Sequence, residues 1–359
     1  MCSGARLTSV SCKNMLRKIA LFTGIIFAAC VVCVRTQDRT PDDVIKVSTA
    51  LVSVPVIVSD RDGRYIPGLR QSDFTVLQDG NPQVVEFFAA VEEPLIVALL
   101  IDTSQSTRGV LGDIKSAAGK FLKLLQPVDK AMIVTFDYDT HLLSPLTTDR
   151  EQLKRAVHDA DIPEYFGTTM RDAVAQTIRG QFKGVTGRKA IILLTDGKDV
   201  GSRVTAADLI YSLQESDVMV YSVFFKTGEI LQQMRPRNDR RGDIFGRQFP
   251  RFPGRRNDPF PQRRRDNPQR RDRVERENGR ATDFLEKLSE VTAGRFYKSN
   301  SSKLKETFGL IIDELRHQYR LGFYPADDMV ETTHAIKVKV SRPDVVVRAR
   351  SNFRTQTRR

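Results

Sequence analysis

Residues 95–106, with the sequence LIVALLIDTSQS, form the most informative segment of this chain of 359 residues. Seven apolar residues run without interruption into Asp102, a pattern typical of a strand buried on both faces of a parallel sheet. The polar residues that follow then lie at the carboxyl end of the strand, where open α/β sheets place their ligand sites. In a tight loop there, Asp102, Ser104 and Ser106 can direct three oxygens at one point, a donor set that suits Mg²⁺. The alternative is that Asp102 and Ser104 only cap the next helix, and this segment alone leaves both open.

Two segments further along the chain extend this pattern. They are FGTTMRDA at residues 166–173 and IILLTDG at residues 191–197, and the second is again an apolar run that ends near an acid. Together with the Asp-x-Ser-x-Ser pattern at 102–106, they resemble a von Willebrand factor A domain. The resemblance implies that the three segments together form a metal-ion-dependent adhesion site.

The resemblance also implies which residues bind the metal. The five family positions fall on Asp102, Ser104, Ser106, Thr168 and Asp196. In the family the hydroxyls bind the ion directly and the acids bind it directly or through water, so few negative ligands surround it. Mg²⁺ is the expected metal, with Mn²⁺ or Ca²⁺ as alternatives, and a carboxylate of a protein partner completes its shell. One departure is Phe166, which stands where the family often has glycine.

The order of the predicted elements favours an α/β fold. From Pro94 onward, apolar strand patterns alternate with amphipathic helix patterns, which predicts right-handed βαβ units and a mostly parallel sheet with helices on both faces. Expected strands cover residues 95–102, 131–136, 141–146, 189–195, 218–225 and 294–297. Expected helices cover residues 110–125, 150–160, 171–182, 206–215, 281–291 and 304–319. We therefore predict a doubly wound α/β domain, of the von Willebrand factor A and Rossmann-like kind, over residues 94–320.

Segments rich in β-branched residues flank this domain on both sides. They cover residues 44–93 and 321–353, with turns such as the one at residues 60–63. Because the ends of an inserted domain usually lie together, we expect both segments to form one small β-sandwich-like module. GLRQSDF at 68–74 and YRLGFYP at 319–325 resemble segments of the exported A-domain-related proteins that are abundant in Acidobacteria. That resemblance does not imply what is bound.

The amino terminus predicts export. Basic residues up to Lys18 precede an apolar run at residues 19–34, which has the length of a signal-peptide core and is slightly short for a membrane span. Residues 1–36 are thus predicted to be a signal peptide or, alternatively, a membrane anchor. The remainder is then expected in the cell envelope, the periplasm or outside the cell. All four cysteines lie in this leader, with Cys30 as a candidate lipid attachment site, so no disulfide is expected in the exported part.

An arginine-rich segment interrupts the α/β pattern at residues 229–280. Residues 231–280 hold 16 arginines and 7 acids, which accounts for most of the net charge of +13. A segment with so many like charges and no apolar period is predicted to be a disordered insertion within the domain. It is either a solvated loop or a binding site for an anionic surface such as acidic lipid, and we expect no specific nucleic acid partner. The Arg-Gly-Asp at 241–243 is interpreted as a chance match.

Catalysis is not expected from this sequence. Ser104 stands where aspartyl phosphotransferases carry a second aspartate, no glycine-rich phosphate loop is present, and the four histidines are scattered singly.

Two function classes remain. The first is an exported, metal-dependent adhesion module that captures an acidic group of a protein partner. The second is an envelope-associated structural protein that binds anionic surfaces through its arginine-rich segment. Loss of binding on mutation of Asp102 would favour the first, and a strong salt dependence would favour the second.

Overall fold

The computed structural model describes residues 51–90, 93–225, 268–300, 303–325 and 332–354. All of them belong to the second of two compact units, Thr49–Arg359. The first unit, Met1–Ser48, contains the predicted leader and lies outside the described residues, as does most of the arginine-rich segment. Within the described ranges, no helix combines the length and the apolar character that crossing a membrane requires.

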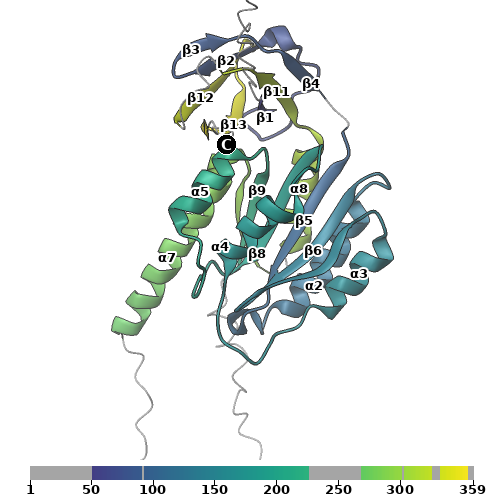
Figure 1. Ribbon diagram of the computed structural model, residues 1–359, viewed down its shortest axis with the longest axis vertical. Helices are drawn as coiled ribbons and strands as arrows, with labels where there is room; N and C mark the ends of the chain where they lie inside the picture. Colours follow the sequence, from purple (N-terminus) through teal and green to yellow (C-terminus); the bar gives the residue numbers. More distant parts are fainter. Residues whose placement is uncertain (1–50, 91–92, 226–267, 301–302, 326–331, 355–359) are drawn as a thin grey trace, which may run out of the picture. The chain divides into compact units, whose positions relative to one another are not determined.

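A mostly parallel sheet forms the middle layer of the helix-covered part of the second unit (Figure 1). Its described strands follow the order β10-β9-β8-β5-β6-β7, and neighbours are parallel except for β6 and β7. The strands are β5 (Leu95–Asp102), β6 (Lys130–Phe136), β7 (Thr140–Thr147), β8 (Arg188–Thr195), β9 (Met219–Phe225) and β10 (Phe296–Ser299). β5 lies between β8 and β6 and is buried along its whole length, as its apolar run predicts.

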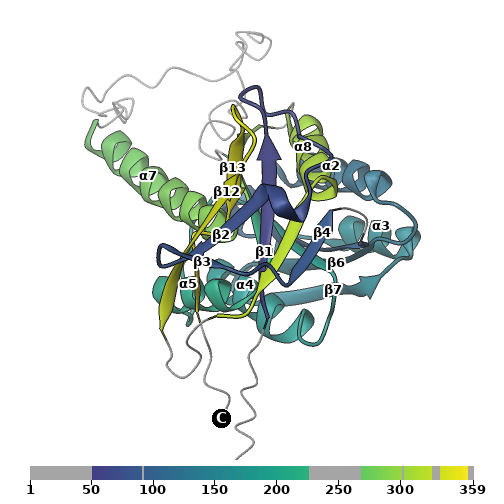
Figure 2. The same cartoon turned by 90° about the horizontal axis from the view of Figure 1, so that it is seen from above.

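Helices cover both faces of this sheet (Figure 1; Figure 2). One face packs against α2 (Leu111–Leu124), α3 (Arg150–Asp159) and α8 (Leu304–Arg316). The other face packs against α4 (Met170–Gln176), α5 (Ala206–Glu215) and α7 (Pro268–Val291). Alternate residues of β5 supply the two cores, since Leu99 belongs to the first and Leu100 to the second. The predicted doubly wound α/β class is confirmed.

Strands from both sides of this α/β region form two antiparallel sheets. In the described residues, their orders are β13-β1-β11-β4 and β14-β12-β2-β3. The strands are β1 (Val52–Ser59), β2 (Phe74–Gln78), β3 (Asn81–Gln83), β4 (Phe87–Ala90), β11 (Tyr319–Phe323), β12 (Thr333–Val340), β13 (Val346–Ala349) and β14 (Asn352–Arg354). β1 pairs with β11 and β2 with β12, so each sheet joins early strands to late ones. One apolar core, which includes Val56, Phe74 and Tyr319, holds the resulting sandwich together.

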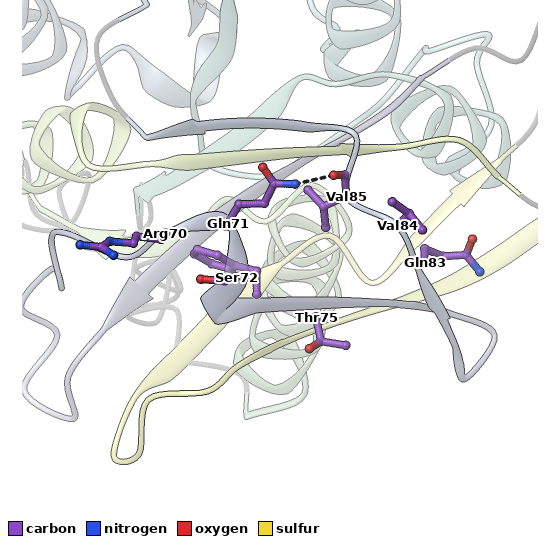
Figure 3. Close-up of a pocket in the computed structure, with 8 residues that line it drawn as sticks. Arg70, Gln71, Ser72, Thr75, Gln83, Val84 and Val85 are labelled. Atoms are coloured by element: carbon purple, nitrogen blue, oxygen red, sulfur yellow. Dashed lines mark hydrogen bonds between the residues drawn. The ribbon is translucent and has the colours of Figure 1, made fainter.

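An open hollow of about 630 Å³ lies on this sandwich beside the short 3₁₀ helix Gln71–Asp73, as Figure 3 shows. Its wall includes the exposed Val84. The Gln71 side-chain amide donates a 2.6 Å hydrogen bond to the Val85 carbonyl oxygen. That bond fixes the connection between β3 and β4, where the sequence pattern favours a strand through Val84, Val85 and Phe87. The strand β4 begins only at Phe87, so Val84 and Val85 belong to the connection despite their strand-like apolar pattern.

α7 corrects a prediction made from the sequence. The sequence predicts disorder over residues 229–280, but α7 begins at Pro268, so this prediction is wrong for residues 268–280. Residues 226–267 lie outside the described part of the chain. Proline is favoured in the first turn of a helix, and the Arg, Gln and Glu residues that follow are good helix formers despite their charge. The helix then continues into Leu285 and Leu288, which are fully buried and attach it to the sheet.

Candidate metal-binding site

The first loop of the site follows β5 directly. Asp102 is completely buried, and its Oδ1 accepts a 2.9 Å hydrogen bond from the Ser104 backbone N–H. The Ser104 and Ser106 hydroxyl oxygens lie 3.0 Å apart, so two potential ligands already converge. The next helix is the short 3₁₀ helix Gln105–Thr107, which starts after Ser104, and α2 begins only at Leu111; neither helix has a side-chain capping hydrogen bond at its N-cap residue. The alternative in which Asp102 and Ser104 serve only as helix caps is therefore not supported.

The second loop follows β8, the strand beside β5. Thr195, the last residue of β8, donates a 2.7 Å hydrogen bond from its hydroxyl to Asp102 Oδ2, which joins the ends of the two strands. Asp196 comes next and is 2% exposed. Gly197 has a φ of +76°, and a Cβ there would lie only 2.8 Å from Cβ of Ala281 on α7. The turn after Asp196 therefore requires glycine for both its backbone conformation and its packing.

The third loop carries Thr168, which is buried and comes just before α4. Its backbone exchanges two hydrogen bonds with Val200 (3.2 and 2.8 Å), which attaches it to the loop of Asp196. Asp137, directly after β6, attaches the third loop to the first. Its carboxylate accepts from the Thr103 hydroxyl at 3.0 Å, and its carbonyl oxygen accepts from the Thr169 backbone N–H at 2.6 Å. The fold thus holds all three predicted loops together at the carboxyl ends of the strands.

Asp102 has an unusual electrostatic environment. Its pKa is raised from 3.8 to about 7, mainly by burial and in addition by the neighbouring Asp196 carboxylate. The hydrogen bonds from Ser104 and Thr195 lower the pKa but do not offset burial. A divalent cation bound by both carboxylates would stabilise the charged form of Asp102, and the hydroxyls of Ser104 and Ser106 are hard oxygen donors of the kind such an ion prefers. The donor set therefore fits a small divalent cation.

Lys198 occupies part of this environment. Its ammonium lies 2.5 Å from Asp196 Oδ2, and its backbone N–H donates to Asp196 Oδ1 at 3.2 Å. The lysine side chain is 43% exposed, whereas that of Asp196 is 2% exposed. A positive charge is thus already drawn to the Asp196 carboxylate, and a metal ion would compete with it for the same oxygen.

Asp199 has a different role from the two buried acids. It accepts hydrogen bonds from the Arg171 backbone N–H at 2.9 Å and from the Ser202 hydroxyl at 2.8 Å, and it forms an ion pair with the Arg171 guanidinium at 3.1 Å. It therefore braces the loop after β8 against the start of α4. Among the described residues, no group of three or more His, Cys, Asp or Glu side chains could hold a metal. Any metal at the three loops must rely on hydroxyls as well as on acids.

Sequence reasoning missed two residues that organise this site, Thr195 and Asp137. Thr195 is the last residue of β8, as Asp102 is of β5, and Asp137 directly follows β6, so the position at a strand end was the available signal. Of the five residues carried over from the family, Asp102 ends β5 and the other four lie in the three joined loops. Their individual assignment as metal ligands stays a prediction.

Residues 97–198, which include all three loops, match the family model described as "von Willebrand factor type A domain". The chain contains a von Willebrand factor type A domain. The matched range begins within β5 and ends just after Asp196, so it holds every predicted ligand position of this A domain.

Solved structures with a similar fold include three examples. An aerotolerance-related membrane protein from Bacteroides fragilis is 16% identical, with 62% of this chain and 98% of that chain covered and a TM-score of 0.41. Proximal thread matrix protein 1 from the mussel byssus, with a zinc-occupied MIDAS motif, is 14% identical, with coverages of 62% and 48% and a TM-score of 0.42. A von Willebrand factor type A protein from Catenulispora acidiphila is 14% identical, with coverages of 79% and 72% and a TM-score of 0.43. No curated protein matches the chain.

Proposed function

We propose that the A domain is an exported, metal-dependent protein-binding module that captures an acidic group of its partner. One observation carries the proposal. The completely buried carboxylate of Asp102 has a raised pKa beside Asp196, at a point where two serine hydroxyls converge. Such a site gains free energy when a divalent cation balances its charge.

Each residue has a distinct part in this proposal. Asp102, Ser104, Ser106, Thr168 and Asp196 would hold the ion, which we propose to be Mg²⁺. The bound ion would supply an electron-poor position for a carboxylate oxygen. Thr195 and the Ser104 backbone N–H fix the two oxygens of Asp102, at 2.7 and 2.9 Å, so the carboxylate cannot rotate away. Lys198 would leave Asp196 as the ion arrives.

The module binds and does not catalyse in this proposal. Its three loops offer acids, hydroxyls and one lysine that is paired with an acid, and His141 pairs with the Asp137 carboxylate at 3.3 Å rather than with a site hydroxyl. Export rests on the predicted leader, which places the module in the cell envelope or outside the cell. The arginine-rich segment is not needed for the proposed binding.

Titration of the purified protein with Mg²⁺ by calorimetry tests the proposal, with Mn²⁺ and Ca²⁺ as further titrants. We expect one saturable binding event that Asp102→Ala abolishes. Asp113→Ala is the matched control, because Asp113 is an exposed acid on α2, and it should bind as the wild type does. Equal binding by all three proteins would contradict the proposal. So would the absence of binding combined with partner capture that does not differ between Mg²⁺ and chelator.

A further inference from the structure

Exposed apolar side chains surround the candidate metal site. Tyr138, Tyr165, Phe166 and Val200 are 47%, 67%, 85% and 68% exposed, and we call these four residues the aromatic rim. Tyr138 follows Asp137, Phe166 comes two residues before Thr168, and Val200 pairs with Thr168 through its backbone. Single exposed apolar residues are common on protein surfaces, but a group of them around one site marks a binding surface.

The rim is held in place by its own contacts. The rings of Tyr138 and Tyr165 pack edge to face with centroids 5.2 Å apart. Gly167 passes so close to Tyr138 that a Cβ on it would lie 2.9 Å from Cβ of Tyr138. The Gln105 side-chain amide, located between the two site serines, donates a hydrogen bond to the Pro163 carbonyl oxygen. The loop that presents Tyr165 and Phe166 is therefore attached both to the loop after β6 and to the first metal loop.

A hollow of about 500 Å³ continues the surface on the side of α7. Val200 lines it together with Arg171, Lys198, Arg280 and Phe284, and the acids Asp199 and Glu277 complete its polar wall. Asp199 is already paired with Arg171. Lys198 is likewise paired with Asp196, and the lining holds three cations against two acids. A divalent cation bound at the neighbouring site would add to this small positive excess and favour an acidic occupant, whereas a second copy of this chain docked by the same face would bring two such cations together. The occupant that fits is thus a segment of another protein that is both acidic and apolar.

We propose that the aromatic rim selects a partner segment in which the carboxylate bound at the metal site lies next to an aromatic or aliphatic side chain. The carboxylate would meet the metal, and the apolar side chain would cover Tyr165 and Phe166 and remove them from water. Aromatic side chains at the centre of interfaces often dominate binding energy, so specificity would reside in the rim rather than in the metal alone. The inference rests on the proposed function, because it assumes that the site binds a metal.

Selection from a random twelve-residue peptide library displayed on phage tests the inference, because it needs no known partner. The full-length wild type is used as bait in Mg²⁺ and in chelator. A double variant, Tyr165→Ser with Phe166→Ser, and a control, Val84→Ser, are used in Mg²⁺. Val84 is 73% exposed and lies on the sandwich, so this control removes an exposed apolar side chain without touching the site. Circular dichroism and Mg²⁺ titration check that each variant is folded and binds metal.

We expect the wild type in Mg²⁺ to enrich peptides with Asp or Glu next to Phe, Tyr, Leu or Ile. The control should do the same, whereas the double variant should still enrich acids but lose the apolar preference. A synthetic copy of the enriched peptide should bind the double variant about tenfold more weakly.

Acidic peptides without an apolar neighbour, or an unchanged preference in the double variant, would overturn the inference and leave the proposed function standing. Failure to enrich acids in a magnesium-dependent way would overturn both. A wild-type dimer that the double variant abolishes, measured by sedimentation, would assign the rim to self-association instead.

Discussion

An aspartate is buried at each end of the central sheet, but the two carboxylates differ in the charge of their hydrogen-bond partners. Asp129 lies at the amino end, just before β6, and is 1% exposed. Its Oδ1 accepts from the Leu95 backbone N–H at 2.9 Å, and its Oδ2 accepts from the Gln126 N–H at 2.7 Å and from the Arg316 guanidinium at 2.9 Å. A cation and two backbone donors thus balance this carboxylate inside the protein.

Asp102, at the carboxyl end, is equally buried but accepts hydrogen bonds from neutral donors and lies near a second acid. The nearby cation, Lys198, is engaged by Asp196. Burial alone therefore does not distinguish a structural acid from a functional one. In the proposed function the distinction lies in whether the protein itself supplies the opposite charge. Arg316 supplies it to Asp129, whereas a bound cation would supply it to Asp102.

The largest effect is expected from Asp129→Ala at the amino end. The change removes one partner of a buried ion pair and leaves the Leu95 and Gln126 N–H groups without their acceptor, so we expect a loss of about 3–5 kcal/mol in the free energy of unfolding. Urea unfolding measures it, and Asp113→Ala should change the same quantity by less than about 0.5 kcal/mol. A loss below about 1 kcal/mol would show that the amino-end charge pair is not structural.

Asp102→Asn should change how stability depends on pH in the presence of chelator. Because the pKa of Asp102 rises from 3.8 in the unfolded chain to about 7 in the fold, its contribution to stability is present below pH 4 and is lost as the pH rises toward 7. The wild type should therefore lose stability over this range relative to the Asn variant, which has no charge to bury. Melting temperatures at pH 4.5 and pH 8 measure the difference. Saturating Mg²⁺ should remove it by stabilising the wild type alone, and parallel pH profiles in chelator would contradict the assignment.

Thr195→Val tests whether the hydroxyl that fixes Asp102 matters for metal binding. Loss of its 2.7 Å hydrogen bond should weaken Mg²⁺ binding about 10- to 100-fold, as is usual when a residue that orients a ligand is changed. Thr177→Val is the matched control, because its buried hydroxyl donates to the Ala173 carbonyl oxygen within a helix. The control should alter stability but not the dissociation constant for Mg²⁺ measured by calorimetry. Equal effects of the two variants on that constant would mean that Thr195 acts only through stability.

The smallest effect is expected from Lys198→Met. Removal of the competing ammonium should tighten Mg²⁺ binding about two- to fivefold, since a half-exposed ion pair contributes about 0.2–1 kcal/mol. Lys154→Met provides the control, because Lys154 lies 2.5 Å from Glu151 with a similar exposure but on α3. Weaker Mg²⁺ binding in Lys198→Met would contradict competition and would instead assign the lysine a supporting role.

The sequence by itself determined the class of the fold. The uninterrupted apolar run of β5 fixes a doubly buried strand, and the alternation of strand and helix patterns fixes a doubly wound sheet. It also placed Asp102 and Asp196 at strand ends, because the strand boundary is a local change from apolar to polar residues. Local patterns failed for residues 268–280, where charge predicted disorder but helix propensity and the buried Leu285 and Leu288 produced α7.

Only the tertiary structure decided which of these polar residues act together. The order β8-β5-β6 brings Thr195 onto Asp102 across 93 residues of sequence and makes Asp137 a link between Thr103 and Thr169. The same order brings the exposed Val200 beside Thr168 and completes the aromatic rim. The physical reason is that strand formation depends on neighbours along the chain, whereas hydrogen bonds, pKa values and binding surfaces depend on neighbours in space.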